Sequence, residues 1–182
     1  MRMLLMHSDF IEYEPKKKAI ASAEAITKSH VRIEDCLVAF CSSEEGDDVS
    51  VIQPSIDAIK DVAQQVQANR IVVYPFVHLS SKPGPPSQAL TIVKGIEEGL
   101  KNDYETYRAP FGWYKEFTVK CKGHPLSELS REITVGAAKK DESEALKKQT
   151  ELKSEFLIIE PSGAEHKIQL QDGNIVGFDF SK

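Results

Sequence analysis

Short apolar runs in the first half of the sequence predict the central strands of a sheet. They lie at residues 2–7, 35–41 and 71–77, and the last run is rich in β-branched and aromatic side chains. Short runs with few polar interruptions are typical of strands that are buried on both faces. We therefore expect these segments to form the core of one sheet.

Two further segments have the apolar spacing of amphipathic helices. In the first, which ends near Val66, apolar residues recur at intervals of three and four, and Ser55 is expected to cap the helix. The second, at 85–100, opens with a Pro-Pro pair that suits a first helical turn. Gly95 and Gly99 lie one turn apart in it and are expected to let the helix approach the sheet closely.

The following segment completes the expected fold. Strands are predicted at 104–108 and 114–120, joined by a turn at 110–112, and a short helix is predicted at 124–133. The order of strand, helix, strand, helix and further strands indicates an α/β or α+β layered fold, in which helices pack on a β-sheet.

The character of the sequence changes after residue 135, which predicts a boundary. We assign residues 1–135 to one domain, 136–153 to a charged linker or exposed helix, and 154–182 to a short β-hairpin segment. The hairpin is indicated by strand signals at 156–159 and 166–170. Because this segment has too few apolar residues to fold alone, we expect it to lead towards the rest of a longer protein.

Composition narrows the class of protein. No apolar run approaches the roughly 18 residues of a membrane span, so we expect a cytoplasmic protein without a membrane partner. The three cysteines do not have the spacing of a metal site, and no metal is predicted. The net charge is −5, yet basic residues outnumber acidic ones between Arg108 and Arg131. That local excess suits contact with one end of a nucleic acid, although on charge alone a solvated strand is the favoured interpretation.

Two clusters at strand ends carry the candidate chemistry, since no phosphate-binding loop, nucleophile elbow or zinc-protease motif is present. The first is YPFVHLSS at 74–81, where His78 follows an apolar strand and could donate a hydrogen bond or transfer a proton. The second is PFGWYK at 110–115, continued by KGHPLSELSR at 122–131. Taken alone, these residues also fit a structural histidine, core aromatics and solvated charges.

Together with HSDFIEYE at 7–14, these blocks occur in an order and spacing that resemble one known family. Residues 1–135 are similar to the editing domain at the front of archaeal threonyl-tRNA synthetases. The resemblance implies a fold like that of the D-aminoacyl-tRNA deacylases, a homodimer, and hydrolysis of serine wrongly attached to tRNA(Thr). It also implies no cofactor in this domain, with ATP and zinc used by the rest of the synthetase.

The resemblance also implies a set of site residues. Lys115 and His78 match catalytic positions, with the Lys115 ammonium expected to place the water or contact the serine hydroxyl. The expected substrate contacts are Tyr114, Glu128, Val77, Ser43 and Phe111, with Val77 and Ser43 acting through their backbone. Ser43 departs from the family pattern, where a small apolar residue fits. For the tRNA acceptor end, the basic residues Lys120, Lys122 and Arg131 are the predicted contacts.

Two other functions stay open at this point. The chain could be a D-aminoacyl-tRNA deacylase that acts on several tRNAs, or a non-catalytic domain that binds tRNA or assembles the synthetase. The PFGWYK and KGHPLSELSR blocks favour the editing hydrolase, because they resemble the synthetase relatives specifically.

Overall fold

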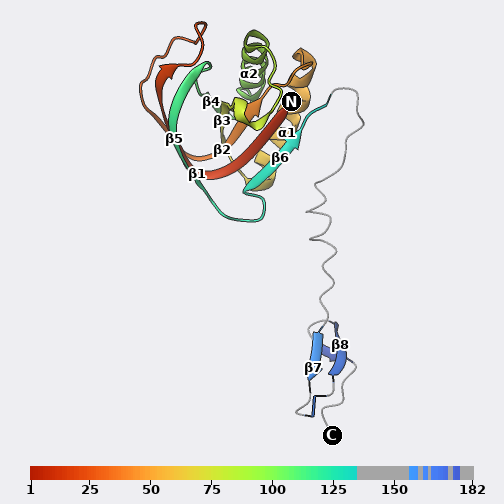
Figure 1. The fold of residues 1–182 in the computed structure, drawn as a ribbon. Coiled ribbons are helices and arrows are strands. Elements are labelled where there is room, and N and C mark those ends of the chain that lie inside the picture. The colour runs from red at the N-terminus through yellow and green to blue at the C-terminus, as the bar shows by residue number, and fades with distance from the viewer. Residues whose placement is uncertain (135–155, 160–161, 164, 172–173, 177–182) are drawn as a thin grey trace. The chain divides into compact units, whose positions relative to one another are not determined.

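The computed structural model describes residues 1–134, 156–159, 162–163, 165–171 and 174–176. The chain divides into two compact units, Met1–Gly136 and Ala137–Lys182 (Figure 1). The predicted linker at 136–153 lies outside the described residues. No helix in the described ranges has both the length and the apolar character that crossing a membrane requires.

A single mixed sheet organises the first unit. Its strands are β1 (Arg2–Lys18), β2 (Val31–Ser42), β3 (Arg70–Pro75), β4 (Glu105–Arg108), β5 (Trp113–Cys121) and β6 (Glu128–Glu132). The order is β4-β3-β2-β1-β5, with β6 also paired to β1. The pairs β2–β3 and β3–β4 are parallel, while β1 is antiparallel to each of its neighbours. β5 and β6 follow one another along the same edge of β1, β6 opposite residues 2–6 and β5 opposite residues 8–18.

The helices of this unit are η1 (Val49–Val51), α1 (Ile52–Val66), η2 (Val77–Leu79) and α2 (Pro86–Leu100). α1 and α2 pack tightly against each other. A Cβ added to Gly95 would lie 2.6 Å from Ile52 Cδ1, and one added to Gly99 would overlap the side chain of Ile56. The two glycines therefore allow α2 to approach α1, which corrects the expectation that they face the sheet.

The central strands have an apolar core on each side. Every residue from Cys36 to Ser42 in β2 is buried, as are the central residues of β3. One side packs against the helices, and the other holds an aromatic cluster in which the rings of Phe40 and Tyr74 have centroids 5.0 Å apart. The long strands β1 and β5 curve around this second core (Figure 1). The predicted α/β architecture with a doubly buried sheet centre is confirmed.

Two local predictions are wrong. The segment predicted as a helix at 124–133 contains β6, which pairs with the first residues of β1. β5 leaves β1 at Cys121, so without β6 the backbone groups of this edge would lack partners. Ser55 does not cap α1, because the helix already begins at Ile52 and the Ser55 hydroxyl donates to the Val51 carbonyl at 2.7 Å.

The second unit contains a small antiparallel sheet. Its strands are β7 (Phe156–Ile159), β8 (Glu165–Gln171) and β9 (Asn174–Val176), in the order β7-β8-β9. β7 and β8 lie at the positions of the two strand signals in the sequence, and β9 was not predicted.

Candidate functional site

A small cavity lies where the ends of several strands meet the N-terminal end of α2. Its volume is about 190 Å³. The lining residues come from five segments: Ala19 and Ile20 after β1; Cys41–Ser43 at the end of β2; Pro75–Val77 from the end of β3; Pro83, Gly84, Pro86, Ala89 and Val93 before and in α2; and Phe111–Trp113 with Lys115. Four residues of the predicted site line it, namely Lys115, Ser43, Val77 and Phe111.

Lys115 projects from β5 into this cavity. Its Nζ donates hydrogen bonds to the carbonyls of Pro110 and Trp113, both at 3.1 Å, and lies 5.0 Å from the ring centroid of Tyr74. Burial lowers the pKa of Lys115 to about 8, against the opposing effect of the Glu24 carboxylate. An ammonium has three N–H groups, so one remains for a bound molecule.

The turn that holds Lys115 is fixed by the segment after β1. The Glu24 carboxylate accepts hydrogen bonds from the Phe111 N–H at 2.8 Å and from Arg108 Nη2 at 3.0 Å. The main-chain carbonyl of Glu24 accepts one from the Trp113 indole N–H at 2.9 Å. Gly112 has a φ of +81°, and a Cβ there would lie 2.9 Å from the Cα of Ala23. Only glycine fits such a contact without strain.

Glu24 and Arg108 form a largely buried pair. Their side chains are 16% and 13% exposed, and Arg108 also donates to Glu97 at 2.6 Å. Burial alone would raise the pKa of Glu24, but hydrogen bonds from Arg108 and from the Phe111 N–H bring it below its ordinary value. Glu24 is therefore an anion at neutral pH and ties the turn at 110–113 to the rest of the domain. It was not among the residues predicted from the sequence.

Ser43 lines the cavity and carries an unused, buried hydrogen-bonding group. Its Oγ is buried and is the one buried side-chain oxygen or nitrogen in the described part of the chain that has no partner. The Ser43 carbonyl, in contrast, accepts from the Gly84 N–H at 3.0 Å. A Cβ on Gly84 would lie 2.9 Å from Ser43 Oγ, so glycine is needed there for close approach. An unpaired buried hydroxyl costs free energy unless a ligand or water satisfies it.

His78 lies beside the cavity without lining it. It belongs to η2, is exposed, and has its ring centroid 5.2 Å from that of Phe76, which does line the cavity. Tyr114 precedes Lys115 on β5 and is 60% exposed. Since neighbouring residues of a strand point to opposite faces, Tyr114 faces away from the side chain of Lys115.

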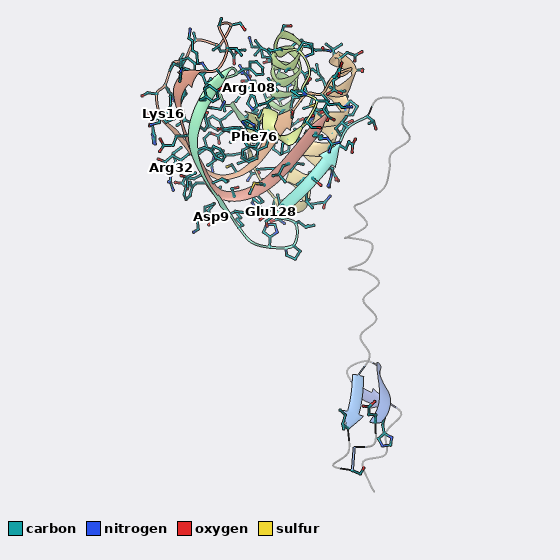
Figure 2. All side chains as sticks on the ribbon, in the orientation of Figure 1. Asp9, Lys16, Arg32, Phe76, Arg108 and Glu128 are labelled. Carbon is teal, nitrogen blue, oxygen red and sulfur yellow. The ribbon has the colours of Figure 1, made fainter. Side chains whose placement is uncertain are left out.

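The remaining predicted site residues lie elsewhere in the domain. Glu128 is on β6 (Figure 2), opposite Met6 of β1. Lys115, on β5, is opposite Pro15 of β1. Met6 and Pro15 are nine residue steps apart, which corresponds to about 30 Å along β1.

The basic residues predicted to bind tRNA are also away from the cavity. Lys120 and Lys122 both contact Asp9, at 3.0 and 3.1 Å, and Lys122 also contacts Asp35 at 3.0 Å. Arg131 lies on β6 opposite Met3. The structure thus groups part of the predicted site and leaves Glu128, Lys120, Lys122 and Arg131 outside that group.

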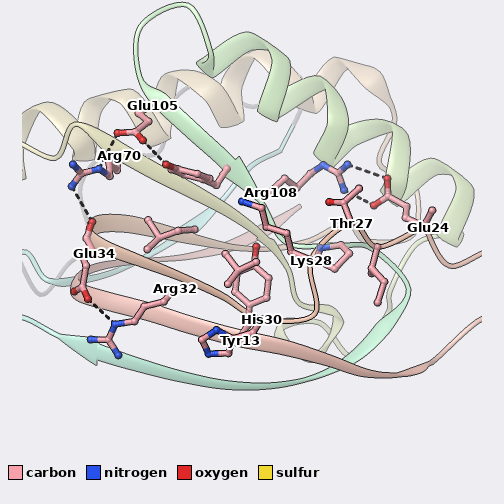
Figure 3. A pocket seen from close by; sticks show the side chains of 16 residues that line it. Tyr13, Glu24, Thr27, Lys28, His30, Arg32, Glu34, Arg70, Glu105 and Arg108 are labelled. Atoms are coloured by element: carbon pink, nitrogen blue, oxygen red, sulfur yellow. Dashed lines mark hydrogen bonds and ion pairs between the residues drawn. The ribbon is translucent and has the colours of Figure 1, made fainter.

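A second, larger cavity of about 830 Å³ is lined by Glu24 and by the residues that follow it (Figure 3). Its arginines are paired with carboxylates: Arg108 with Glu24, Arg70 with Glu105 at 2.9 Å, and Arg32 with Glu34 at 2.6 Å. No sequence motif indicated this cavity. Across the described residues, no group of three or more histidine, cysteine and acidic side chains is arranged to hold a metal ion.

The sequence matches one described family over most of the first unit. The family is the archaea-specific editing domain of threonyl-tRNA synthetase, and the match covers residues 1–133. The threonine–tRNA ligase of Pyrococcus furiosus is 49% identical over 90% of this chain, and that of Methanosarcina mazei is 44% identical over all of it. The chain spans 27% and 30% of the length of these two relatives.

A solved structure shares the fold. The c-Myc DNA Unwinding Element Binding Protein aligns with a TM-score of 0.55 at 11% sequence identity, over 74% of this chain and 99% of the other. At this identity the likeness concerns the fold alone, and it agrees with the α/β class predicted from the sequence.

Proposed function

The chain belongs to the archaea-specific editing domains of threonyl-tRNA synthetase, and we propose that it hydrolyses the ester of Ser-tRNA(Thr) and spares Thr-tRNA(Thr). In this reaction water attacks the ester carbonyl, the bond to the terminal ribose breaks, and serine and tRNA are released. Because the chain spans less than a third of its ligase relatives, we also propose that it acts as part of a longer synthetase. The predicted homodimer stays a prediction.

The need for such a reaction follows from the size of one methyl group. Serine lacks the methyl group of threonine, and a hydrophobic pocket gains only about 1–3 kcal/mol from such a difference. A second site that excludes the larger side chain supplies the missing accuracy. The Lys115 cavity, at about 190 Å³, is small enough for one added methyl group to matter.

The position of the Lys115 ammonium in the cavity is the main support for the proposal. Its ammonium is held by the main-chain carbonyls of Pro110 and Trp113 in a largely apolar cavity, with one N–H still available. There it donates to the serine hydroxyl or to the attacking water, and the surrounding low dielectric strengthens that interaction. We assign Lys115 the main role in placing the reacting groups, and His78, at the edge of the cavity, a supporting role as a donor.

Ser43 supplies a second contact. Ser43 lines the same cavity, its buried Oγ has no partner among the described residues, and a bound seryl group offers both a hydroxyl and an amine. The sequence predicted a backbone contact at this position, and the buried hydroxyl extends that role to the side chain. Val77 and Phe111 complete the apolar wall that the seryl side chain would contact.

The direct test is incubation of the full chain with Ser-tRNA(Thr), Thr-tRNA(Thr) and a D-aminoacyl-tRNA. Selective loss of the serine ester is the expected result. Equal cleavage of the serine and threonine esters would contradict the proposal. Loss of the D-ester alone would favour a D-aminoacyl-tRNA deacylase, and no loss of any ester would favour a binding or assembly role.

A further inference from the structure

Three consecutive lysines, Lys16, Lys17 and Lys18, end the first strand. Lys16 is neutralised by Glu14 at 2.8 Å and by Glu116 at 3.0 Å. Lys17 and Lys18 are exposed and form no ion pair with any of the described residues. The strand therefore ends in two cations whose charge is available to a partner.

These two lysines lie at the edge of the Lys115 cavity. In the β1–β5 register Lys17 is opposite Tyr114 and Lys18 is opposite Trp113. The Lys18 ammonium lies 5.9 Å from the centroid of the Trp113 ring, and Trp113 lines the cavity. The chain then continues directly into Ala19, which also lines it.

An exposed aromatic side chain accompanies the cations. Tyr114 is 60% exposed, and its place opposite Lys17 puts both side chains on the same face of the strand pair. Lys18, opposite Trp113, points to the other face, which is the face of Lys115. Lysines beside an exposed aromatic ring are the combination with which proteins bind single-stranded nucleic acid, the cations contacting phosphates and the ring stacking on a base.

We propose that the single-stranded 3′ end of the tRNA docks across the edge of the sheet formed by β5, where it contacts Lys17 and Tyr114 on one face and Lys18 on the face of the cavity. The two lysines contact its phosphates and Tyr114 stacks on one of its bases, so that the terminal ribose ester reaches the Lys115 cavity. This inference rests on the proposed function, because it names where the substrate of that same site is held. It replaces Lys120 and Lys122 as the expected contacts, since Asp9 and Asp35 already neutralise them.

The test compares two double variants of the full chain, Lys17→Ala/Lys18→Ala and Lys120→Ala/Lys122→Ala. Binding of uncharged tRNA(Thr) is measured between 50 and 200 mM salt, chosen as the range in which counterion release dominates. For Lys17→Ala/Lys18→Ala, the plot of log affinity against log salt should become shallower, its slope decreasing in magnitude by about 1.4, or about 0.7 per lost phosphate contact. The affinity itself should drop about tenfold. Lys120→Ala/Lys122→Ala should keep the wild-type slope.

Tyr114→Phe and Tyr114→Ala form a matched pair for the stacking contact. Alanine should weaken binding about tenfold with an unchanged salt slope, while phenylalanine keeps a ring and should bind like the wild type. An unchanged slope in Lys17→Ala/Lys18→Ala, or a reduced slope in Lys120→Ala/Lys122→Ala, would overturn the proposal.

Hydrolysis of 3′-O-seryl-adenosine separates this inference from the proposed function. That ester has no phosphate, so Lys17→Ala/Lys18→Ala should cleave it at the wild-type rate while losing activity on Ser-tRNA(Thr). Equal losses on both esters would contradict a role in tRNA docking. If the wild-type chain cleaves neither ester, the proposed function fails, and the salt dependence of binding still decides whether these lysines hold the tRNA.

Discussion

The two ends of the β1–β5 pair contain similar residues and differ in how much of their hydrogen-bonding capacity is used. Near Lys115, one ammonium N–H and the Ser43 hydroxyl have no hydrogen-bond partner, and Lys17 and Lys18 form no ion pair, within the described part of the chain. Near His7, where β5 leaves β1, His7 is hydrogen-bonded to His124, and Lys122 is paired with Asp9 and Asp35. We therefore expect unused polar groups to mark the binding region better than residue type alone.

The His7 end is a closed network. The Leu126 N–H donates to His124 Nδ1 at 3.3 Å, so His124 Nε2 carries the proton and donates to His7 Nδ1 at 2.8 Å. Main-chain hydrogen bonds flank the pair: the His7 N–H donates to the Ser127 carbonyl, and the His7 carbonyl accepts from the Lys122 N–H. This end therefore holds the loop between β5 and β6 in place.

The largest effect is expected at Lys115. Lys115→Met should reduce single-turnover hydrolysis of Ser-tRNA(Thr) by about 100-fold, because one preorganised donor in a low-dielectric site has an effect of that size. Lys122→Met, at the other end, should keep most of the activity. Similar losses in both variants would remove the distinction between the two regions.

The pH dependence sharpens the same prediction. The pKa of Lys115 is lowered to about 8, so the side chain is a charged donor below that pH and a neutral amine above it. The advantage of the wild type over Lys115→Met should therefore shrink as the pH rises through about 8, in rates measured from pH 6.5 to 9. An advantage that grows with pH would indicate that the neutral amine acts as a base.

The next effect concerns the turn that carries Lys115. Glu24→Ala leaves Arg108 buried without its main anion and the Phe111 N–H without an acceptor. We expect the free energy of unfolding to fall by about 2 kcal/mol in urea denaturation at pH 7. Asp9→Ala removes exposed ion pairs at the other end and should change stability little. A larger loss in Asp9→Ala would reverse the comparison.

Glu24 also shows why part of the site could not be predicted from the sequence. The apolar runs of β2 and β3 and the helical spacing of α1 and α2 are local patterns, and they predicted these elements correctly. Glu24 acts through Arg108, 84 residues further along the chain, and no local pattern encodes such a pairing. The second cavity has the same origin, because its walls come from segments far apart in the sequence.

β6 shows the corresponding limit for the fold. Leu126, Leu129 and Ile133 recur at intervals of three and four, as in a helix. The unpaired edge of β1 decides the outcome instead, since it offers backbone partners to Glu128–Glu132. The motif blocks located Lys115 and its cavity, but they did not distinguish the paired lysines Lys120 and Lys122 from the unpaired Lys17 and Lys18.

A smaller and two-sided effect is expected at Ser43. Ser43→Ala removes the unpaired hydroxyl, so the thermal midpoint should rise slightly, while KM for Ser-tRNA(Thr) should increase about tenfold because the substrate loses a partner. Ser42→Ala is the matched control, since the Ser42 hydroxyl already donates to the Val77 carbonyl at 3.3 Å. That variant should lose stability. A normal KM in Ser43→Ala would show that only the backbone matters at this position.

The smallest effect is expected at His7. Burial, the charge of Lys122 and the neighbouring His124 lower the pKa of His7, so the unfolded chain binds the proton more readily than the folded one. Stability should therefore decrease as the pH falls below about 6.5, the ordinary pKa of histidine. Protonation of His7 Nδ1 also replaces the acceptor of the His7–His124 hydrogen bond with a second N–H donor, so the bond is lost. His7→Asn keeps an acceptor without titrating, so its thermal midpoint should change less than that of the wild type between pH 7.5 and 5.5. An equal change in both proteins would show that the histidine pair does not set the acid sensitivity of this end.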